Sequence, residues 1–491
     1  MKKQGFNPFL PSWEYIPDAE PYVFDDGNGG KRVYIYGSHD MFNGYAYCMN
    51  DYVCWSAPQD DLTSWRYEGI IYKKTDDPFN KDASMHLYAP DVTKGPDGRY
   101  YLYYVLDKMD TIGVAVCQTP AGKYEYLGYV HYADGTLLGK KEGDVPQFDP
   151  AVLTEGDKTY LYSGQCTGKA KTVENFRNYS IAVVLGPDML TIEEGPFPLI
   201  PGFNASGGTG FEGHEFFEAS SIRKINDTYY FIYSSFAMNE LCYATSKEPL
   251  GGFKYGGVIV SNADMGVDSY KPACKLMYHG NNNHGSIAEI NGQWYVFYHR
   301  HTNGNEFSRQ ACLEKIQISE DGSINQVPMT SCGANNGPLE GKGEYPAYIA
   351  CNIFSMEDIK EPLKTYWPNR NPEMPFITQD ECDIQPGDLS QSNFNEGHSF
   401  ITNILDGCGA GFKYFDCKNV TTVKVKIRGY CRGFFEVKNK WNGETLGKID
   451  VVSSNIWKNF EAKIKIPDGI QSIYFIYKGT GIATIGSFTL E

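Results

Sequence analysis

A strand pattern that recurs five times constrains this chain more than any other feature of its sequence. Each copy places a turn rich in Gly, Asp or Asn directly before a short strand with many aromatic residues. Turns of this composition between two strands are hairpin signals. The aromatic strands begin about 60 to 70 residues apart and cover residues 31–36, 98–104, 157–162, 227–233 and 292–298. Regular spacing of this kind indicates a repeat architecture.

A short apolar strand with a polar opening precedes every one of these hairpins. The openings carry an acidic residue in four copies and a histidine in the fifth. They lie at residues 18–24, 89–93, 149–153, 218–222 and 284–288. Each copy therefore predicts an inner strand, a tight turn, an aromatic strand and further outer strands. Five such units predict an all-β fold, a five-bladed β-propeller.

The polar openings of the inner strands should meet near the axis of this propeller, because the first strand of each blade lines the central channel. The predicted axial residues are Glu20 (with Asp18 as the alternative), Asp91, Asp149, Glu218 and His284. A turn-forming or strand-capping role would explain an acid at any single position. Several acids gathered around one axis repel each other, however, and this cost favours a functional site.

The pattern changes towards the C-terminus. We expect the propeller to occupy residues 1–345, with the segment near residues 6–13 pairing with the last blade and closing the ring. Recurrent prolines predict a connector over residues 346–381. Strand-like segments spaced 10 to 15 residues apart then predict a β-sandwich over residues 382–491.

Composition narrows the partners and the compartment. With 44 Lys and Arg against 60 Asp and Glu, the net charge is −16. Such a surface repels phosphates and anionic lipids, so we expect no nucleic-acid or membrane partner, whereas neutral sugars and calcium are permitted. The 13 cysteines form no CxxC pair with metal-ligand spacing, and we expect most to be reduced and buried. No apolar run follows the N-terminal lysines, which favours a cytoplasmic location.

Paired carboxylates across a scissile bond are the requirement of glycoside hydrolysis. One carboxyl group protonates the departing oxygen, and the other activates water or attacks the sugar. A third acid nearby can raise the pKa of the proton donor by charge repulsion. Glu218, Asp91 and the acid of the first blade would suffice for these three roles.

Five motifs in order resemble glycoside hydrolase family 43, a family of five-bladed propellers. They are Glu20-Pro21, Ala89-Pro90-Asp91-Val92, Asp149-Pro150-Ala151-Val152, Glu218-Ala219-Ser220-Ser221 and His284-Gly285-Ser286. The resemblance implies Glu218 as general acid, Asp91 as the residue that tunes its pKa, and the first-blade acid as general base. The family usually places an Asp directly before the proline of that first motif. Here Glu20 takes this position and Asp18 lies two residues earlier, so Glu20 is the preferred base and Asp18 the alternative.

The same resemblance implies further ligands of substrate and metal. His284 would hold a calcium ion, largely through water. Arg309, Phe148, Asp149 and His86 would bind the substrate. The C-terminal domain resembles carbohydrate-binding module family 6, in which Trp441 could stack on sugars. A domain that only braces the propeller is the alternative.

The resemblance implies an inverting, exo-acting α-L-arabinofuranosidase that removes arabinose from arabinoxylan or arabino-oligosaccharides. A β-D-xylosidase acting on xylo-oligosaccharides is the alternative, since members of both kinds share the same acids. The partner would then be a small, pentose-containing oligosaccharide. A different class, a sugar-binding propeller without catalysis, would require the loss of one of the carboxylates.

Overall fold

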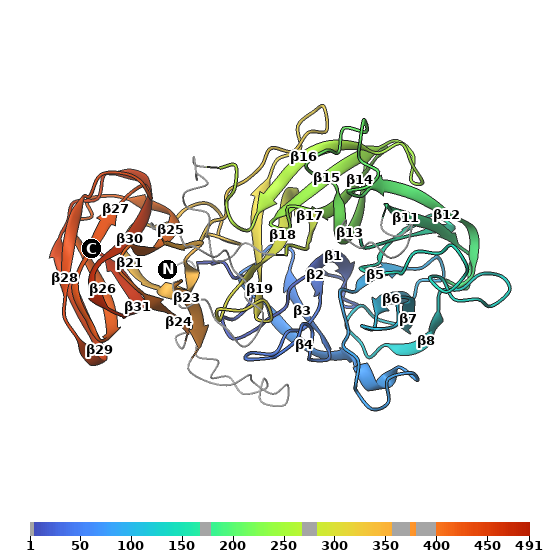
Figure 1. The fold of residues 1–491 in the computed structure, drawn as a ribbon, viewed down its shortest axis with the longest axis horizontal. Coiled ribbons are helices and arrows are strands. Elements are labelled where there is room, and N and C mark those ends of the chain that lie inside the picture. The colour runs from blue at the N-terminus through green and yellow to red at the C-terminus, as the bar shows by residue number, and fades with distance from the viewer. Residues whose placement is uncertain (1–3, 167–177, 268–281, 356–373, 380–398) are drawn as a thin grey trace.

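The computed structural model describes residues 4–166, 178–267, 282–355, 374–379 and 399–491 (Figure 1). Its regular structure consists of β-strands and two short 3₁₀ turns, η1 (Lys74–Asp76) and η3 (Ala347–Ile349). The all-β class predicted from the sequence is therefore confirmed. The middle part of the predicted connector and the start of the predicted sandwich lie outside the described residues.

Five antiparallel sheets follow one another along the first two thirds of the chain, each made of consecutive strands. The first sheet contains β1 (Glu20–Asp25), β2 (Lys31–Tyr36), β3 (Tyr52–Pro58) and β4 (Arg66–Tyr72). The second contains β5 (Asp91–Lys94), β6 (Tyr100–Val105), β7 (Ile112–Cys117) and β8 (Glu125–Tyr129). The third contains β9 (Ala151–Glu155), β10 (Lys158–Ser163), β11 (Tyr179–Leu185) and β12 (Ile192–Pro201). The fourth contains β13 (Phe216–Ile225), β14 (Thr228–Ser235), β15 (Glu240–Ser246) and β16 (Lys254–Ser261), and the fifth contains β17 (Ser286–Ile290), β18 (Gln293–His301) and β19 (Arg309–Ile316).

The first strands of these sheets lie together at the centre of the assembly (Figure 1). β5 contacts β9, β9 contacts β13, β13 contacts β17, and β17 contacts β1. The second strands are the five aromatic segments of the sequence repeat, and their tyrosines fill the space between neighbouring sheets. Tyr162 of β10, for example, packs edge-on against Phe231 of β14 with ring centroids 5.9 Å apart. Aromatic residues fit this position because they bury a large area on a pleated surface.

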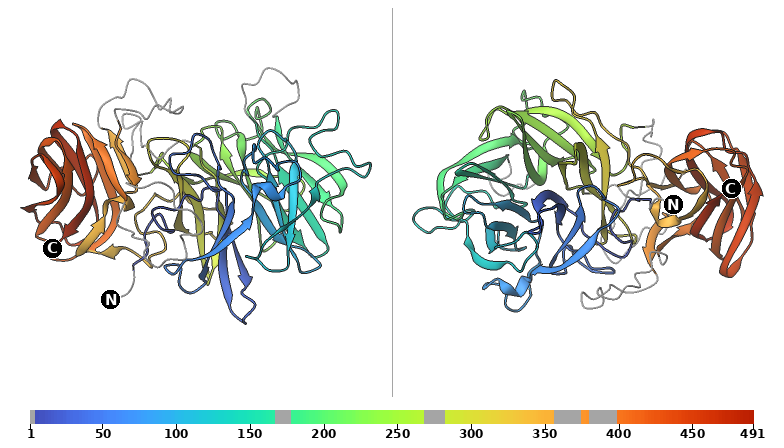
Figure 2. Two further views of the ribbon diagram at one scale, coloured as in Figure 1. Left: turned by 90° about the horizontal axis from the view of Figure 1, so that it is seen from below. Right: turned by 180° about the vertical axis from the view of Figure 1, so that it is seen from behind.

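Two six-stranded sheets form the C-terminal part, on one side of the five sheets (Figure 2). One contains β20 (Leu339–Glu340), β22 (Asn352–Ser355), β25 (Cys408–Cys417), β30 (Gly469–Gly481), β27 (Cys431–Lys438) and β28 (Gly447–Val451). The other contains β21 (Gly343–Pro346), β23 (Phe376–Gln379), β24 (Ser399–Ile404), β31 (Ala483–Leu490), β26 (Thr422–Gly429) and β29 (Ser454–Lys463). They share one apolar core, in which Phe412 and Phe488 have ring centroids 4.5 Å apart.

The boundary between the two parts differs from the sequence prediction. Strands β20, β21, β22 and β23 pair with strands of the C-terminal sheets, although they fall before residue 382. The expected connector at 346–381 therefore contributes strands instead of acting only as a linker. These strands have two to four residues each, which is too short for an alternating pattern to be recognised among the prolines.

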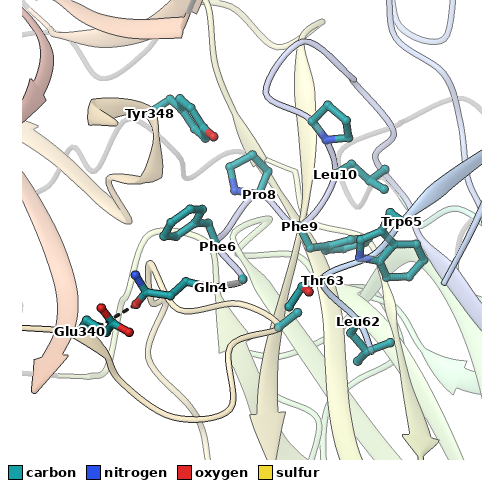
Figure 3. A pocket seen from close by; sticks show the side chains of 13 residues that line it. Gln4, Phe6, Pro8, Phe9, Leu10, Leu62, Thr63, Trp65, Glu340 and Tyr348 are labelled. Carbon is teal, nitrogen blue, oxygen red and sulfur yellow. Dashed lines mark hydrogen bonds between the residues drawn. The ribbon is translucent and has the colours of Figure 1, made fainter. Parts of the chain in front are cut away.

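The N-terminal segment runs between the two parts of the molecule. Its backbone N–H at Phe9 donates to the Ala311 carbonyl (3.3 Å), and the Asn7 side chain donates to the Leu313 carbonyl (2.9 Å). The segment thus lies along β19, as expected from the sequence. A cavity of about 300 Å³ opens beside it, and Phe9, Trp65 and Tyr348 line this cavity (Figure 3). None of the predicted axial acids lies in it.

Buried polar groups join the five sheets to the C-terminal part. The fully buried Arg300 of β18 donates to the carbonyls of Tyr348 and Ala350, both at 2.7 Å. Lys413 of β25 forms an ion pair with Asp264 at 2.7 Å, and both side chains are fully buried. Because a buried charge is costly without its partner, these contacts tie the two parts together.

Two further expectations concern individual residues. Trp441 is buried in a cluster with Phe354 and Tyr474, so the expectation of an exposed sugar-stacking ring was wrong. All eleven cysteines that lie in the described part of the chain are free, and most of them are buried. In the same part of the chain, no helix is long and apolar enough to cross a membrane.

Candidate active site

The side chains that face the central cavity come from positions just before the inner strands. Asp18, Asp149 and His284 each precede the first residue of their strand by two positions. Ala89 holds the same position before β5, and it also lines the cavity. Glu218 lies inside β13, where register shifts on both sides of it interrupt the ladder with β14. In four of the five sheets, the residue two positions before the inner strand therefore lines the cavity.

This cavity has a volume of about 380 Å³. Six residues predicted from the sequence line it: Asp18, Phe148, Asp149, Glu218, His284 and Arg309. Further residues line it as well: Tyr47, Tyr88, Gln165, Asn282, His299 and Glu306. Glu20, Asp91 and His86 are absent from the lining. His86 instead lies 3.9 Å from the Asp107 carboxylate.

Asp18 is held as a carboxylate by Arg309. Nη1 of Arg309 donates to Asp18 Oδ1 at 3.1 Å, while its Nε and Nη2 make a bidentate pair with Asp40 at 2.8 and 2.9 Å. His299 Nδ1 lies 3.2 Å from the same Asp18 oxygen. Burial by itself would raise the pKa of Asp18, but the Arg309 charge and the His299 contact outweigh it and bring the pKa well below its usual range. Asp18 is therefore ionised at neutral pH.

The pKa of Glu218 is shifted in the opposite direction, upwards. Burial raises its pKa to about 7, and the charge of Asp18 adds to this rise, although a hydrogen bond from Gln165 Nε2 (2.9 Å) opposes it. A carboxyl group with this pKa carries a proton in a large fraction of molecules near neutral pH. The cavity thus holds one carboxylate and one proton donor, which is the division of roles that acid–base catalysis needs.

Asp149 links these two groups. Its Oδ2 accepts a hydrogen bond from the backbone N–H of Ala219 at 3.0 Å, directly beside Glu218. Burial and the charges of Glu218 and Asp18 raise the pKa of Asp149 well above its usual range. Asp149 and Glu218 therefore compete for a proton, and a negative charge on Asp149 favours the protonated form of Glu218.

The backbone is strained where these acids project. Asp18, Asp149 and Ala219 have φ values of 58°, 45° and 68°. This left-handed region is unfavourable for residues other than glycine, and such residues concentrate at functional sites. The strain aims neighbouring side chains of three different sheets into one cavity.

Glu20 and Asp91 belong to a second group, which we call the inner layer and which also contains Tyr22 and Arg223. Arg223 Nη2 donates to Glu20 Oε2 at 2.6 Å. Asp91 accepts from the Tyr22 hydroxyl and from the backbone N–H groups of Val92 and Val152, each at 2.7 Å. Both acids occupy the first residue of their strand, and both are buried.

The contacts of the inner layer tie the central strands together. Asp91 connects β5, β1 and β9, and Arg223 connects β13 with β1 and, through the Ile287 carbonyl at 3.0 Å, with β17. The described hydrogen bonds occupy both oxygens of Asp91. This geometry does not suit Asp91 or Glu20 for contact with a substrate, and the placement favours Asp18, the alternative base.

His284 lies among the pocket acids, with Nδ1 at 3.6 Å from Asp149 Oδ2 and 3.8 Å from Asp18 Oδ1. Burial lowers its pKa to about 4, so the imidazole is neutral at pH 7. Calcium takes six to eight oxygen ligands. Two carboxylates lie close to His284. Asp18 already forms an ion pair with Arg309, and Asp149 already accepts a hydrogen bond from the backbone N–H of Ala219. The donor set of the chain therefore fits calcium only if water supplies most of the ligands.

Two of these additional lining residues, Tyr47 and Glu306, lie on loops outside the repeat. The Tyr47 hydroxyl donates to Glu306 at 2.5 Å, and the Arg309 guanidinium lies over the Tyr47 ring, 4.8 Å from its centroid. The loop that carries Glu306 is fixed at Asn303, whose backbone N–H donates to the Ile377 carbonyl of β23 at 2.6 Å. A strand of the C-terminal sheets thus positions one wall of the cavity.

Comparisons with known proteins show the family of this chain. The family model of glycosyl hydrolases family 43 matches residues 19–324. A xylosidase/arabinosidase of Thermoclostridium stercorarium is 65% identical over 493 residues, which cover 100% of this chain and 99% of that protein.

Two solved structures resemble the chain. A family 43 β-xylosidase/α-arabinofuranosidase from a compost microbial metagenome, solved with xylotriose in a calcium-free form, has 26% identity and a TM-score of 0.50 over 66% of this chain and 98% of that one. An arabinoxylan arabinofuranohydrolase of Bacillus subtilis has 20% identity and a TM-score of 0.51 over 99% of this chain and 97% of that one, which shows a shared fold. With a family model that matches well over half of its length and this full-length relative, the chain belongs to glycosyl hydrolases family 43 and is a glycoside hydrolase.

Proposed function

We propose that this enzyme removes terminal pentose units, α-L-arabinofuranosyl or β-D-xylosyl, from short oligosaccharides with inversion at the anomeric carbon. The observation that carries the proposal is the opposite tuning of two carboxyl groups in one cavity. Asp18 is ionised beside Arg309, and the pKa of Glu218 is raised to about 7. The name of the full-length relative supports the pentose specificity.

In the proposed mechanism, Asp18 is the general base and Glu218 the general acid. Asp18 takes a proton from a water molecule, which attacks the anomeric carbon. Glu218 transfers its proton to the departing glycosidic oxygen. Asp149 keeps Glu218 protonated, and Arg309 and His299 hold Asp18 in place. Phe148 and Tyr88, whose rings pack at 5.4 Å, form an apolar wall of the cavity.

These roles differ from the sequence-based preferences at two positions. We assign the base to Asp18 instead of Glu20, and the tuning of the acid to Asp149 instead of Asp91. Arg309 and Phe148 keep the substrate-binding roles proposed from the sequence, and His284 keeps its role as the calcium ligand. Asp149, proposed from the sequence as a substrate-binding residue, is now assigned to tuning the pKa of Glu218. We do not assign His86 to the substrate, because Tyr88 lines the cavity instead.

The proposed architecture is a five-bladed propeller of the five sheets β1 to β19, followed by a β-sandwich of β20 to β31. The contacts that run from β5 through β9, β13 and β17 to β1 support the propeller, together with the hydrogen bond from Tyr22 of β1 to Asp91 of β5. The shared core of the two C-terminal sheets supports the sandwich. For this sandwich we favour a bracing role over sugar binding, because Trp441 is buried and a β23 contact supports the cavity wall.

Calcium and the compartment are also part of the proposal. A calcium ion held by His284 and water would balance the negative charge of the pocket. The free, mostly buried cysteines suit a reducing compartment such as the cytoplasm. A chelator tests the ion: reduced hydrolysis that is restored by added calcium supports it, and unchanged hydrolysis contradicts a functional role.

Hydrolysis of two aryl glycosides and an oligosaccharide tests the central proposal. The wild-type chain should release nitrophenol from the aryl α-L-arabinofuranoside, the aryl β-D-xyloside, or both. Glu218→Gln should lower kcat on an oligosaccharide by about 10³-fold, because a sugar leaving group needs the proton. The loss should be smaller on the aryl glycosides, whose leaving group departs unprotonated.

The matched control is Glu212→Gln, which changes an exposed acid of the same segment and should leave kcat unaltered. Equal losses on both kinds of substrate would contradict the acid role of Glu218. Full activity of Glu218→Gln on the oligosaccharide would overturn the mechanism.

A further inference from the structure

Three side chains with different donor atoms converge at the fourth sheet, outside the cavity. A nitrogen of His214, a carboxylate oxygen of Glu240 and the sulfur of Cys242 all lie within 4.8 Å of one another. The proposed hydrolysis uses none of them. Nitrogen, oxygen and sulfur donors together are typical of zinc sites in proteins.

The fold prearranges these donors. Glu240 and Cys242 are two residues apart on β15, so their side chains leave the same face of the sheet. His214 lies in the turn before β13, and its carbonyl accepts a hydrogen bond from the Tyr233 hydroxyl at 2.7 Å. Its ring is stacked on Tyr255, with centroids 4.8 Å apart and planes 12° apart. Backbone and ring of His214 are therefore both held in position.

The distances are close to those of a tetrahedral site. His214 Nδ1 lies 2.8 Å from Glu240 Oε2, and Cys242 Sγ lies 3.7 Å from the same oxygen. Zinc bonds of about 2.0 Å to nitrogen and oxygen and about 2.3 Å to sulfur separate tetrahedral ligands by about 3.3 Å for N and O and about 3.5 Å for S and O. Shifts of about half an ångström or less would bring these two distances to tetrahedral values, and the third pair, His214 and Cys242, lies within 4.8 Å.

Support and access complete the site. The Ser235 hydroxyl donates to Glu240 Oε2 at 2.8 Å, which resembles the outer hydrogen bonds that orient metal ligands. The His214 side chain is 33% exposed, whereas Cys242 is buried. An ion can therefore reach the site from the His214 side, and water can supply a fourth ligand.

We propose that His214, Glu240 and Cys242 form a binding site for one divalent cation of the zinc class. The sulfur and nitrogen donors disfavour calcium and magnesium, which prefer oxygen. The ion would connect the turn before β13 with β15. His214, in this turn, lies four residues before Glu218 in the chain. We expect it to stabilise the fold and to leave the proposed hydrolysis almost unchanged.

Titration of the full-length, chelator-treated protein with Zn²⁺ tests the site, with Co²⁺ as a spectroscopic probe. The wild type should bind one equivalent of Zn²⁺, and Co²⁺ should give a thiolate-to-metal charge-transfer band. Cys242→Ser should abolish this band. His214→Gln should weaken Zn²⁺ binding at least 100-fold. Cys117→Ser, at a partly exposed thiol of the second sheet, should behave like the wild type.

Calorimetric binding curves for the four proteins decide the outcome. No Zn²⁺ binding by the wild type would overturn the proposal, as would undiminished binding by His214→Gln. If Cys242→Ser does not fold, His214→Gln remains decisive, because the partly exposed His214 side chain can change without disturbing the core. Activity is measured separately, so failure of this site and failure of the proposed hydrolysis are distinguishable.

Discussion

Two groups of acids lie near the centre of this molecule, and they have similar compositions but opposite surroundings. The pocket group contains Asp18, Asp149 and Glu218 with one arginine, and the inner layer contains Glu20 and Asp91 with another. Arg309 contacts Asp18 from one side, and the carboxyl groups of the pocket border an open cavity. In the inner layer, backbone N–H groups, a tyrosine and Arg223 surround the carboxyl groups.

The comparison shows that an acid near a propeller axis is not sufficient to define a catalytic residue. A shift of two positions relative to the strand separates Asp18 and Asp149 from Glu20 and Asp91, whereas Glu218 lies inside β13 where register shifts interrupt the ladder. A residue two places before the strand reaches the cavity, whereas the first residue of the strand joins its neighbours across the axis. The inner layer thus has a structural role in the proposed mechanism and the pocket group a chemical one.

The largest expected contrast lies between the two acids that flank Ala19. Asp18→Asn should lower kcat by about 10³-fold, because the amide cannot accept the proton of water. The fold should persist, since asparagine tolerates the positive φ of this position. Glu20→Gln should retain nearly all of the activity per folded molecule. Initial rates of the two purified variants would reverse our assignment if Glu20→Gln were the inactive one.

The second contrast concerns stability. Arg223→Met leaves Glu20 and Asp91 without their cation, and loss of one partner from a buried ion pair typically costs about 3–5 kcal/mol. We expect the free energy of unfolding to fall by this amount in urea titrations, while kcat of the folded fraction stays near the wild-type value. An unchanged unfolding midpoint would remove the structural role of the inner layer.

The pH profile of Asp149→Asn sharpens the comparison within the pocket. In the wild type, activity should decline as pH rises through about 7, because Glu218 must be protonated to act. The low pKa of Asp18 keeps the base ionised down to acidic pH. Without the Asp149 carboxylate, Glu218 loses a neighbouring negative charge and its pKa falls, so the alkaline limb of kcat/KM should move to lower pH. A limb that stays in place in rate profiles from pH 4 to about 9 would argue against Asp149 as the tuning residue.

The smallest expected effect concerns the cavity wall. Glu306→Gln weakens the hydrogen bond from Tyr47 but keeps the shape of the side chain. We therefore expect KM to rise roughly 2- to 10-fold with little change in kcat. Tyr47→Phe removes the same bond from the other side and serves as the matched variant. Steady-state kinetics that show a loss of kcat instead would place Glu306 closer to the chemistry than we infer.

Much of the fold could be predicted from the sequence. The five aromatic segments correspond to β2, β6, β10, β14 and β18, because alternation and hairpin turns are local signals. The three acids of the pocket group, Asp18, Asp149 and Glu218, were among the candidates, whereas Glu306 was not. Their roles were not all assigned correctly, because matching by residue type treated Asp91 and Asp149 as equivalent positions of two repeats. Asp91 is the first residue of β5, whereas Asp149 lies two residues before β9. Counting back from the strand start would have placed Ala89 beside Asp149.

Other features had no local signal. Glu306, Tyr47 and Asn282 reach the cavity from loops whose position depends on distant contacts, such as that of Asn303 with β23. The burial of Trp441 depends on packing against Phe354 and Tyr474, residues far away in the sequence. Interactions of this kind follow from the assembled fold and cannot be recognised in a short window of sequence.

The contacts of Arg300 determine where this enzyme could be shortened. A protein cut at residue 345 would lose the Tyr348 and Ala350 carbonyls, and the Arg300 guanidinium would lose two of its protein acceptors at a newly exposed face. A cut there would also remove the lysine that neutralises Asp264. The five sheets and the C-terminal part therefore form a single unit for truncation and for exchange between relatives. A shortened catalytic fragment would have to include residues 346–350. It would also need a substitution at Asp264, because Lys413 would no longer neutralise this carboxylate.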